Sequence, residues 1–130
     1  MTIERFPSPS RYAPSIGFSA AVRAGDLVFV AGMTAVEPDG SVTGGEDPYA
    51  QAAAALGKLA AALEVAGARL DQVVQTRIHL TDAGDAEAVG RAHREAFGGA
   101  PPAAAMLVTG LLDPRMRVEI EAVAHVGATP

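Results

Sequence analysis

Apolar and polar residues alternate most regularly near the end of the chain, over residues 116–126 (MRVEIEAVAHV). One set of alternate positions holds Met116, Val118, Ile120, Ala122 and Ala124. The other set holds Arg117, Glu119, Glu121, Val123 and His125. Because side chains of a strand point to its two faces in turn, this pattern predicts a strand with one face packed against helices.

A second segment, residues 73–80 (VVQTRIHL), also predicts a strand. We expect one face to hold Val74, Thr76, Ile78 and Leu80. We expect the other face to hold Val73, Gln75, Arg77 and His79. The two faces should therefore meet different environments.

Three further segments have strand character. Residues 18–23 and 27–31 flank Ala24-Gly25-Asp26, a length and composition suited to a hairpin. The third, residues 101–110 (PPAAAMLVTG), follows a predicted helix and carries no ionisable side chain. We expect a strand there that offers methyl groups, a thioether and backbone.

Two helices are predicted between these strands. Asp47-Pro48 has the chemistry of a helix start, and an alanine-rich run continues to Ala66 before Gly67 ends it. The second helix is expected over residues 84–97, capped by Asp85 and followed by two glycines.

The predicted element order is β-β-α-β-α-β-β, which is typical of an α+β fold with both helices on one face of a single sheet. The Pro/Ser-rich residues 1–15 are interpreted as an N-terminal arm, and residues 16–130 as a single domain. We expect Phe29, Val73 and Val123 on the uncovered face of the sheet. Such a face predicts contact with other subunits.

The net charge of −5 and the pI near 5.0 argue against nucleic-acid binding, which needs clustered Lys and Arg. The chain has no cysteine, and its first residues contain no apolar run, so we expect no membrane span and a cytoplasmic location. His79, His93 and His125 have no metal-ligand spacing. We expect no metal and no cofactor.

Four segments together resemble the Rid family, also called YjgF or L-PSP. They are AAVRAGDLVFVAG, LEVAGARLDQVVQTRIHLTD, EAFGGAPPA and RVEIEAVA, and they fall in the family's order and spacing between residues 16 and 126. The resemblance implies a fold like that of bacillary chorismate mutase. It also implies a homotrimer that binds a small metabolite in clefts between neighbouring subunits.

The better-known members of the family hydrolyse reactive imines and enamines to 2-oxo acids and ammonia, and an arginine in a Pro-Ala-Arg-Ser motif holds the substrate carboxylate. That motif falls on residues 102–105, where Ala104 stands at the arginine position. A methyl group cannot replace the bidentate hydrogen bonds of a guanidinium. The chain is therefore a diverged member that lacks the family's carboxylate anchor.

Other family positions compare unevenly. The resemblance implies that Glu119 orders the attacking water, that the backbone amide of Gly32 lines the cleft, and that Phe18 keeps the ring but not the hydroxyl of the family's tyrosine. Arg77 stands where better-known members have a small hydroxyl residue, so it is a candidate for a relocated anchor. Met106 lies beside the lost arginine and is interpreted as a residue that fills space in the substrate site.

Each assignment has a structural alternative. Glu119 could belong to a salt-bridge ladder with Arg117 as its partner, and Arg77 could be an interface residue, because arginine is enriched at interfaces. Two functions follow: a diverged imine or enamine hydrolase, or a trimer without turnover that binds a small ligand or serves as a scaffold. Ribonuclease activity, also described in the family, ranks third because of the acidic charge.

Overall fold

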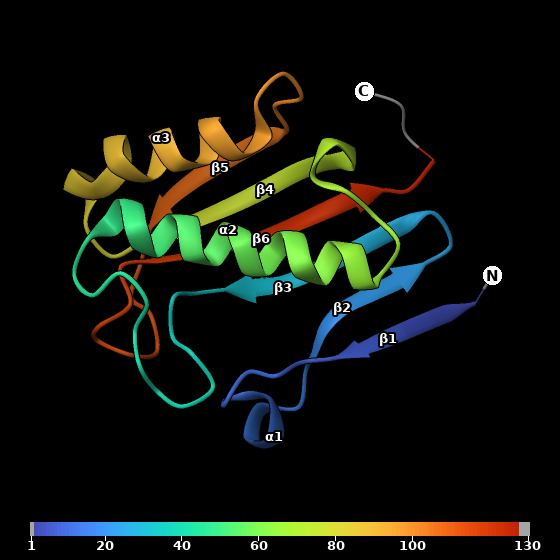
Figure 1. Ribbon diagram of the computed structural model, residues 1–130, viewed down its shortest axis with the longest axis horizontal. Helices are drawn as coiled ribbons and strands as arrows, with labels where there is room; N and C mark the ends of the chain where they lie inside the picture. The colour runs from blue at the N-terminus through green and yellow to red at the C-terminus, as the bar shows by residue number, and fades with distance from the viewer. Residues whose placement is uncertain (1, 128–130) are drawn as a thin grey trace.

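The computed structural model describes residues 2–127 and contains one mixed sheet with its two long helices on one side (Figure 1). The strands are β1 (Ile3–Pro7), β2 (Ser19–Ala24), β3 (Leu27–Met33), β4 (Val73–Leu80), β5 (Ala103–Val108) and β6 (Val118–His125). The helices are α1 (Ala13–Ile16), α2 (Pro48–Val65) and α3 (Ala86–Phe97). Two short 3₁₀ turns, Leu70–Gln72 and Ala83–Asp85, precede β4 and α3.

The strand order across the sheet is β1-β2-β3-β6-β4-β5. All neighbouring strands are antiparallel except β4 and β5, which are parallel. Helix α2 packs over the middle strands β3 and β6, and α3 lies beside α2 (Figure 1). The predicted α+β fold, with two long helices on one face of a single sheet, is confirmed.

Helix α2 begins where its capping residues predict. The carboxylate of Asp47 accepts hydrogen bonds from the amides of Tyr49 and Ala50, and Pro48 occupies the first turn. The side of α2 that faces the sheet is apolar, and Leu59 and Leu63 are completely buried. The alternate apolar residues of β6 complete the core between helix and sheet, as expected.

The N-terminal segment differs from the expectation of an arm without regular structure. Ile3–Pro7 form the edge strand β1, which pairs with β2. The hydrophobic pattern gives little sign of this strand because its residues are mostly exposed, and backbone hydrogen bonds hold it in place. The division at residue 15 into arm and domain stays a prediction, and β1 and α1 are additions to the predicted element order.

The start of β4 also differs from the prediction. Val73 is 5% exposed and faces the helices, whereas Val74 is 46% exposed on the opposite side. The pairing of β4 with β6 shifts register between Val73 and Gln75, and such a bulge reverses the side to which the preceding residues point. The expectation that Val73 lies on the uncovered face is therefore wrong.

Asp85 does not cap α3 through its side chain, contrary to the prediction. Its carboxylate instead accepts two hydrogen bonds from Arg117, at 3.0 Å from Nε and 3.1 Å from Nη2. The preceding Asp82 caps the short 3₁₀ turn by accepting from the amide of Gly84. Asp85 thus links the start of α3 to the segment that enters β6.

Candidate active site on the open sheet face

The face of the sheet opposite the helices, called the open face below, carries apolar side chains together with charged side chains of β4 and β6. Phe29 is 44% exposed there, and Val123 is its cross-strand neighbour. A cavity of about 360 Å³ on this face is lined by residues of β3, β4 and β6, including Phe29, Gly32, Arg77 and Glu121. The predicted uncovered face therefore has a depression with charged groups in it.

Glu119 is the most perturbed carboxylate of this face. It lies on β6 opposite His79 of β4 and is partly buried. Burial raises the pKa of the Glu119 carboxyl above its ordinary value, the neighbouring Glu121 raises it further, and His79 lowers it. Such a carboxylate is a better proton acceptor than an exposed glutamate, which is the property required of a general base.

Gly32 lies directly against Glu119. A Cβ atom built at Gly32 would be 2.8 Å from Cδ and 2.9 Å from Oε2 of Glu119. Any larger residue would have to displace the carboxylate, so the glycine is required by close approach rather than by its backbone conformation. The structure thus brings together two of the residues predicted from the family resemblance.

Arg77 reaches the same face but is already paired. Its Nη1 donates a hydrogen bond of 3.2 Å to Oε1 of Glu121, its cross-strand neighbour. Nε2 of His79 lies 3.5 Å from the other oxygen of Glu121. The Arg77 side chain is 56% exposed, so this ion pair is worth at most about 1 kcal/mol and leaves other N–H groups of the guanidinium free to meet a ligand.

The salt-bridge ladder considered for Glu119 is not present in the predicted form. Arg117, the expected partner, pairs with Asp85 instead, and this contact keeps the pKa of Arg117 above its ordinary value. The residue that does form ion pairs is Glu121, for which no role was predicted. Strict alternation places Glu121 on the face of Glu119, but its partner depends on the register between β4 and β6, which the sequence does not reveal.

The remaining predicted site residues lie elsewhere in the chain. Ala104 and Met106 are the neighbours of Thr76 and Ile78 in the β4–β5 register, so they share the side of the sheet that carries the helices. Ala105 and Leu107 are the β5 residues that neighbour Arg77 and His79. Phe18 precedes β2 and is partly buried. Within one chain, Ala104 and Met106 lie on the opposite side of the sheet from Glu119, and the substrate-binding roles of Ala104, Met106 and Phe18 stay predictions.

Comparison with known proteins gives the family. The family model described as Endoribonuclease L-PSP matches residues 8–126. The chain belongs to this family. It is 40% identical over 127 residues to an uncharacterized protein of Streptomyces coelicolor, covering 97% of this chain and 94% of that protein.

Solved structures of L-PSP family members have the same fold. A member of the YjgF/YER057c/UK114 family from Mycobacterium tuberculosis is 41% identical, with a TM-score of 0.85 over 96% of this chain and 100% of that one. RidA from an Antarctic Psychrobacter is 27% identical, with a TM-score of 0.76 over 84% of this chain and 88% of that one. The predicted family and its chorismate-mutase-like fold are thus confirmed.

Among residues 2–127, no helix has the length and hydropathy needed to cross a membrane. The cytoplasmic location stays a prediction.

Proposed function

We propose that this protein is a homotrimeric hydrolase of small reactive imines or enamines, with its sites in clefts between subunits. The observation that carries the proposal is the Glu119 carboxylate, which is partly buried on the open face against Gly32 and has a raised pKa. A partly desolvated carboxylate beside exposed main chain is suited to activating water next to a polarised C=N bond.

The reaction needs one base and one proton carrier. Glu119 accepts a proton from water while the oxygen attacks the carbon of the protonated imine, and the C=N electron pair moves to the nitrogen to give a neutral carbinolamine. The protonated carboxyl then gives its proton to the nitrogen, and the C–N bond breaks to release ammonia. The restored carboxylate takes the proton of the hydroxyl, so that a carbonyl remains, and passes this proton to solvent. An enamine enters the same path after tautomerising to the imine, so no cofactor is required.

The substrate should depend less on a carboxylate than the substrates of better-known members do. Ala104 removes one charge-assisted contact, which is worth roughly 1.5–3 kcal/mol. Arg77 supplies a cation on the open face but pairs with Glu121, so a substrate anion would have to compete with that pair.

A second candidate function is a trimer that binds a small ligand, or acts as a scaffold, without turnover. The pairing of Arg77 with Glu121 favours it, because an arginine already neutralised by a carboxylate is typical of a subunit interface. In that case the cleft binds a more apolar molecule and Glu119 has no chemical role.

The test is a coupled assay in which an amino-acid-derived imine is generated in solution and ammonia release is followed. Turnover by the wild type that is lost in Glu119→Gln but retained in Glu121→Gln supports the hydrolase, because the two glutamates lie two residues apart on the same strand. No turnover above the uncatalysed rate, in the wild type and in Ala104→Arg alike, favours the binding or scaffold function.

A further inference from the structure

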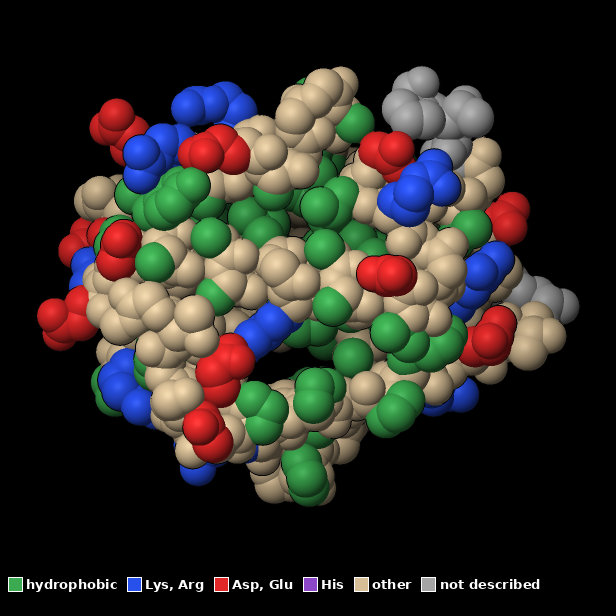
Figure 2. Space-filling model, viewed as in Figure 1, with side chains coloured by type: hydrophobic (Ala, Val, Ile, Leu, Met, Phe, Trp, Pro, Cys, Tyr) green, Lys and Arg blue, Asp and Glu red, His purple; other side chains and the backbone are tan. Residues whose placement is uncertain are grey.

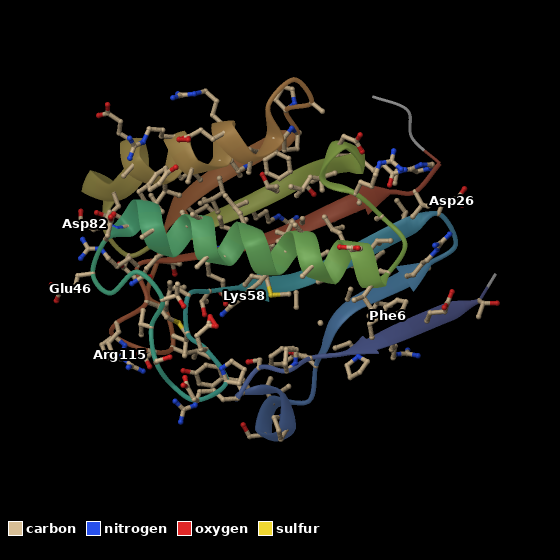
Figure 3. The ribbon with its side chains drawn as sticks, in the orientation of Figure 1. Phe6, Asp26, Glu46, Lys58, Asp82 and Arg115 are labelled. Atoms are coloured by element: carbon tan, nitrogen blue, oxygen red, sulfur yellow. The ribbon has the colours of Figure 1, made fainter. Side chains whose placement is uncertain are left out.

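A second cavity lies on the other side of the sheet, between α2, the segment after β1 and the loop after β3. Its volume is about 380 Å³. Figure 2 shows a dark hollow near the middle of the molecule with apolar side chains around its rim, and Figure 3 labels Phe6 beside β1 and Lys58 beneath α2. None of the predicted site residues except Gly32 lines this cavity.

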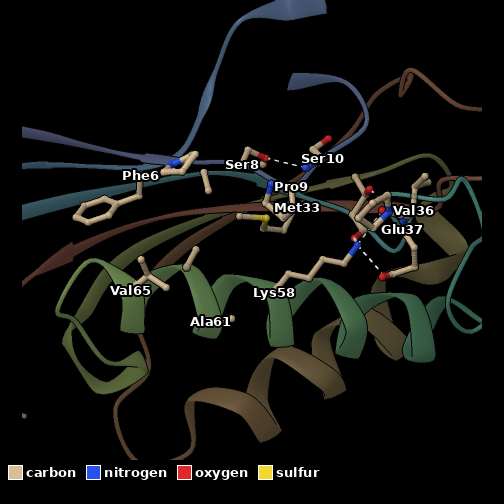
Figure 4. Close-up of a pocket in the computed structure, with 16 residues that line it drawn as sticks. Phe6, Ser8, Pro9, Ser10, Met33, Val36, Glu37, Lys58, Ala61 and Val65 are labelled. Carbon is tan, nitrogen blue, oxygen red and sulfur yellow. Dashed lines mark hydrogen bonds and ion pairs between the residues drawn. The ribbon is translucent and has the colours of Figure 1, made fainter. Parts of the chain in front are cut away.

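The two ends of the cavity differ in chemistry. Phe6, Ala61 and Val65 line one end, and Lys58 and Glu37 line the other (Figure 4). The Phe6 side chain packs against the core while lying beside a register shift in the β1–β2 pairing. An occupant that suits this cavity therefore has an apolar body and one polar end.

Lys58 determines which polar group an occupant of the cavity should carry. Its Nζ donates to the carbonyls of Thr34 and Val36, both at 2.8 Å, and forms an ion pair of 2.9 Å with Oε1 of Glu37. These three contacts use all three N–H donors. The two carbonyls belong to the fixed backbone, whereas Glu37 is a side chain of a turn-rich loop, so its carboxylate is the contact that a ligand can replace.

Two hydroxyl groups at the cavity wall add to this preference. The oxygens of Ser8 and Ser10 accept hydrogen bonds from the amides of Ser10 and Tyr12, which directs their own O–H groups to act as donors. Both serines line the cavity. Donor groups and a lysine at a partly desolvated wall favour an acceptor with negative charge.

We propose that this cavity binds a small monocarboxylate with an apolar tail, whose carboxylate takes the place of Glu37 on Lys58. The volume lies within the range of small-molecule sites in proteins. This inference does not depend on the proposed hydrolase function.

The probe is octanoate, titrated into the full-length protein and followed by calorimetry and by ¹H–¹⁵N NMR. Saturable binding is expected, with the largest amide shifts along α2 around Lys58 and in residues 33–38. 1-Octanol, which has the same tail without the charge, should bind at least threefold more weakly. Octanoate that does not saturate, or that shifts mainly the open face, overturns the proposal.

Variants make the test specific. Ala61→Phe should fill the cavity and abolish octanoate binding, whereas the matched Ala53→Phe, which lines a separate groove on the opposite flank of the same helix, should retain it. Equal affinity in the two variants contradicts the assigned site.

Glu37 gives the most discriminating result. Glu37→Gln removes the competing carboxylate and should tighten octanoate binding by about threefold, the range expected for a partly exposed ion pair. Lys58→Met should abolish the preference for octanoate over 1-octanol, provided that its thermal midpoint shows a folded protein. Weaker octanoate binding in Glu37→Gln overturns the proposed exchange of carboxylates.

Discussion

The fold destabilises the ionised form of the Glu119 side chain, because burial raises the pKa of its carboxyl above its ordinary value. The folded state therefore binds a proton more readily than the unfolded state does. The preferential protonation of Glu119 in the folded state therefore contributes to the free energy of unfolding. This contribution is fully present below the pKa of the unfolded state and is lost as the pH rises through the pKa of the folded state. When the carboxyl is ionised, only the field of His79 stabilises it among residues 2–127.

Glu119→Gln should accordingly retain or increase the free energy of unfolding at neutral pH. Glutamine keeps the shape of the side chain and removes the desolvated charge. The difference from the wild type should disappear at about pH 4, below the ordinary glutamate pKa. Urea unfolding at both pH values measures it. A clear loss of stability in the variant at neutral pH would instead show that Glu119 has a structural ion-pair role.

Gly32→Ala tests the close approach at the same site. The added Cβ would lie 2.8 Å from Cδ of Glu119, so the carboxylate must move, while the strand itself can accept alanine. We expect imine hydrolysis to fall at least tenfold and the free energy of unfolding to change by less than about 1 kcal/mol. Gly99→Ala is the matched control, since nothing lies within 4 Å of a Cβ there. Full activity of Gly32→Ala would show that hydrolysis does not need the close approach of Gly32 to Glu119.

At the scale of secondary structure, segments with a strong hydrophobic period could be predicted and exposed edge segments could not. The bounds of β4 and the cap of α2 match the sequence analysis because burial and capping are local properties. Strand β1 was not predicted because it joins the sheet edge through backbone hydrogen bonds. Few of its side chains are buried, so its sequence shows no alternating hydrophobic pattern. The side to which Val73 points could not be predicted either. A bulge at Val74 reverses it, and the position of a bulge depends on the pairing with the partner strand.

The candidate site also has residues that could be predicted from the sequence and a contact that could not. Glu119 and Gly32 were found through the family resemblance, and the structure brings them into contact. The ion pair between Arg77 and Glu121 joins two residues that are 44 positions apart in sequence, and it could not be predicted without the β4–β6 register. Pairings of this kind are non-local, so alternation within one strand identifies the face but not the partner.

The link between α3 and β6 gives a prediction at this scale. Both carboxylate oxygens of Asp85 bind Arg117, and the Asp85 side chain is 9% exposed. Asp85→Ala should lower the free energy of unfolding by about 2 kcal/mol, less than for a fully buried pair because the Arg117 side chain is 34% exposed. Asp47→Ala, which removes only a helix cap, should cost about 1 kcal/mol. Equal losses in urea unfolding would show that the pair adds nothing beyond a cap.

The molecule as a whole has one face that its own helices protect and one face that they do not. The open face exposes Phe29 and Val74 among the charged groups of β4 and β6. A chain of 130 residues has a small core, and much of it here is alanine, so burying this face between subunits would add stability that a single chain lacks. The same association would place the Glu119 sites beside neighbouring subunits.

We expect a homotrimer of about three times 13.2 kDa, and Val123→Asp should dissociate it. Val123 neighbours Phe29 and Gln75 on the open face, so the substitution places three new carboxylates on a shared and partly desolvated surface. Ala53→Asp, an exposed change on the outer side of α2, is the control and should leave the trimer intact. Light scattering with size-exclusion chromatography measures both masses. A stable monomer of the wild type contradicts the trimer, and a trimer that survives Val123→Asp places the subunit contact away from Val123.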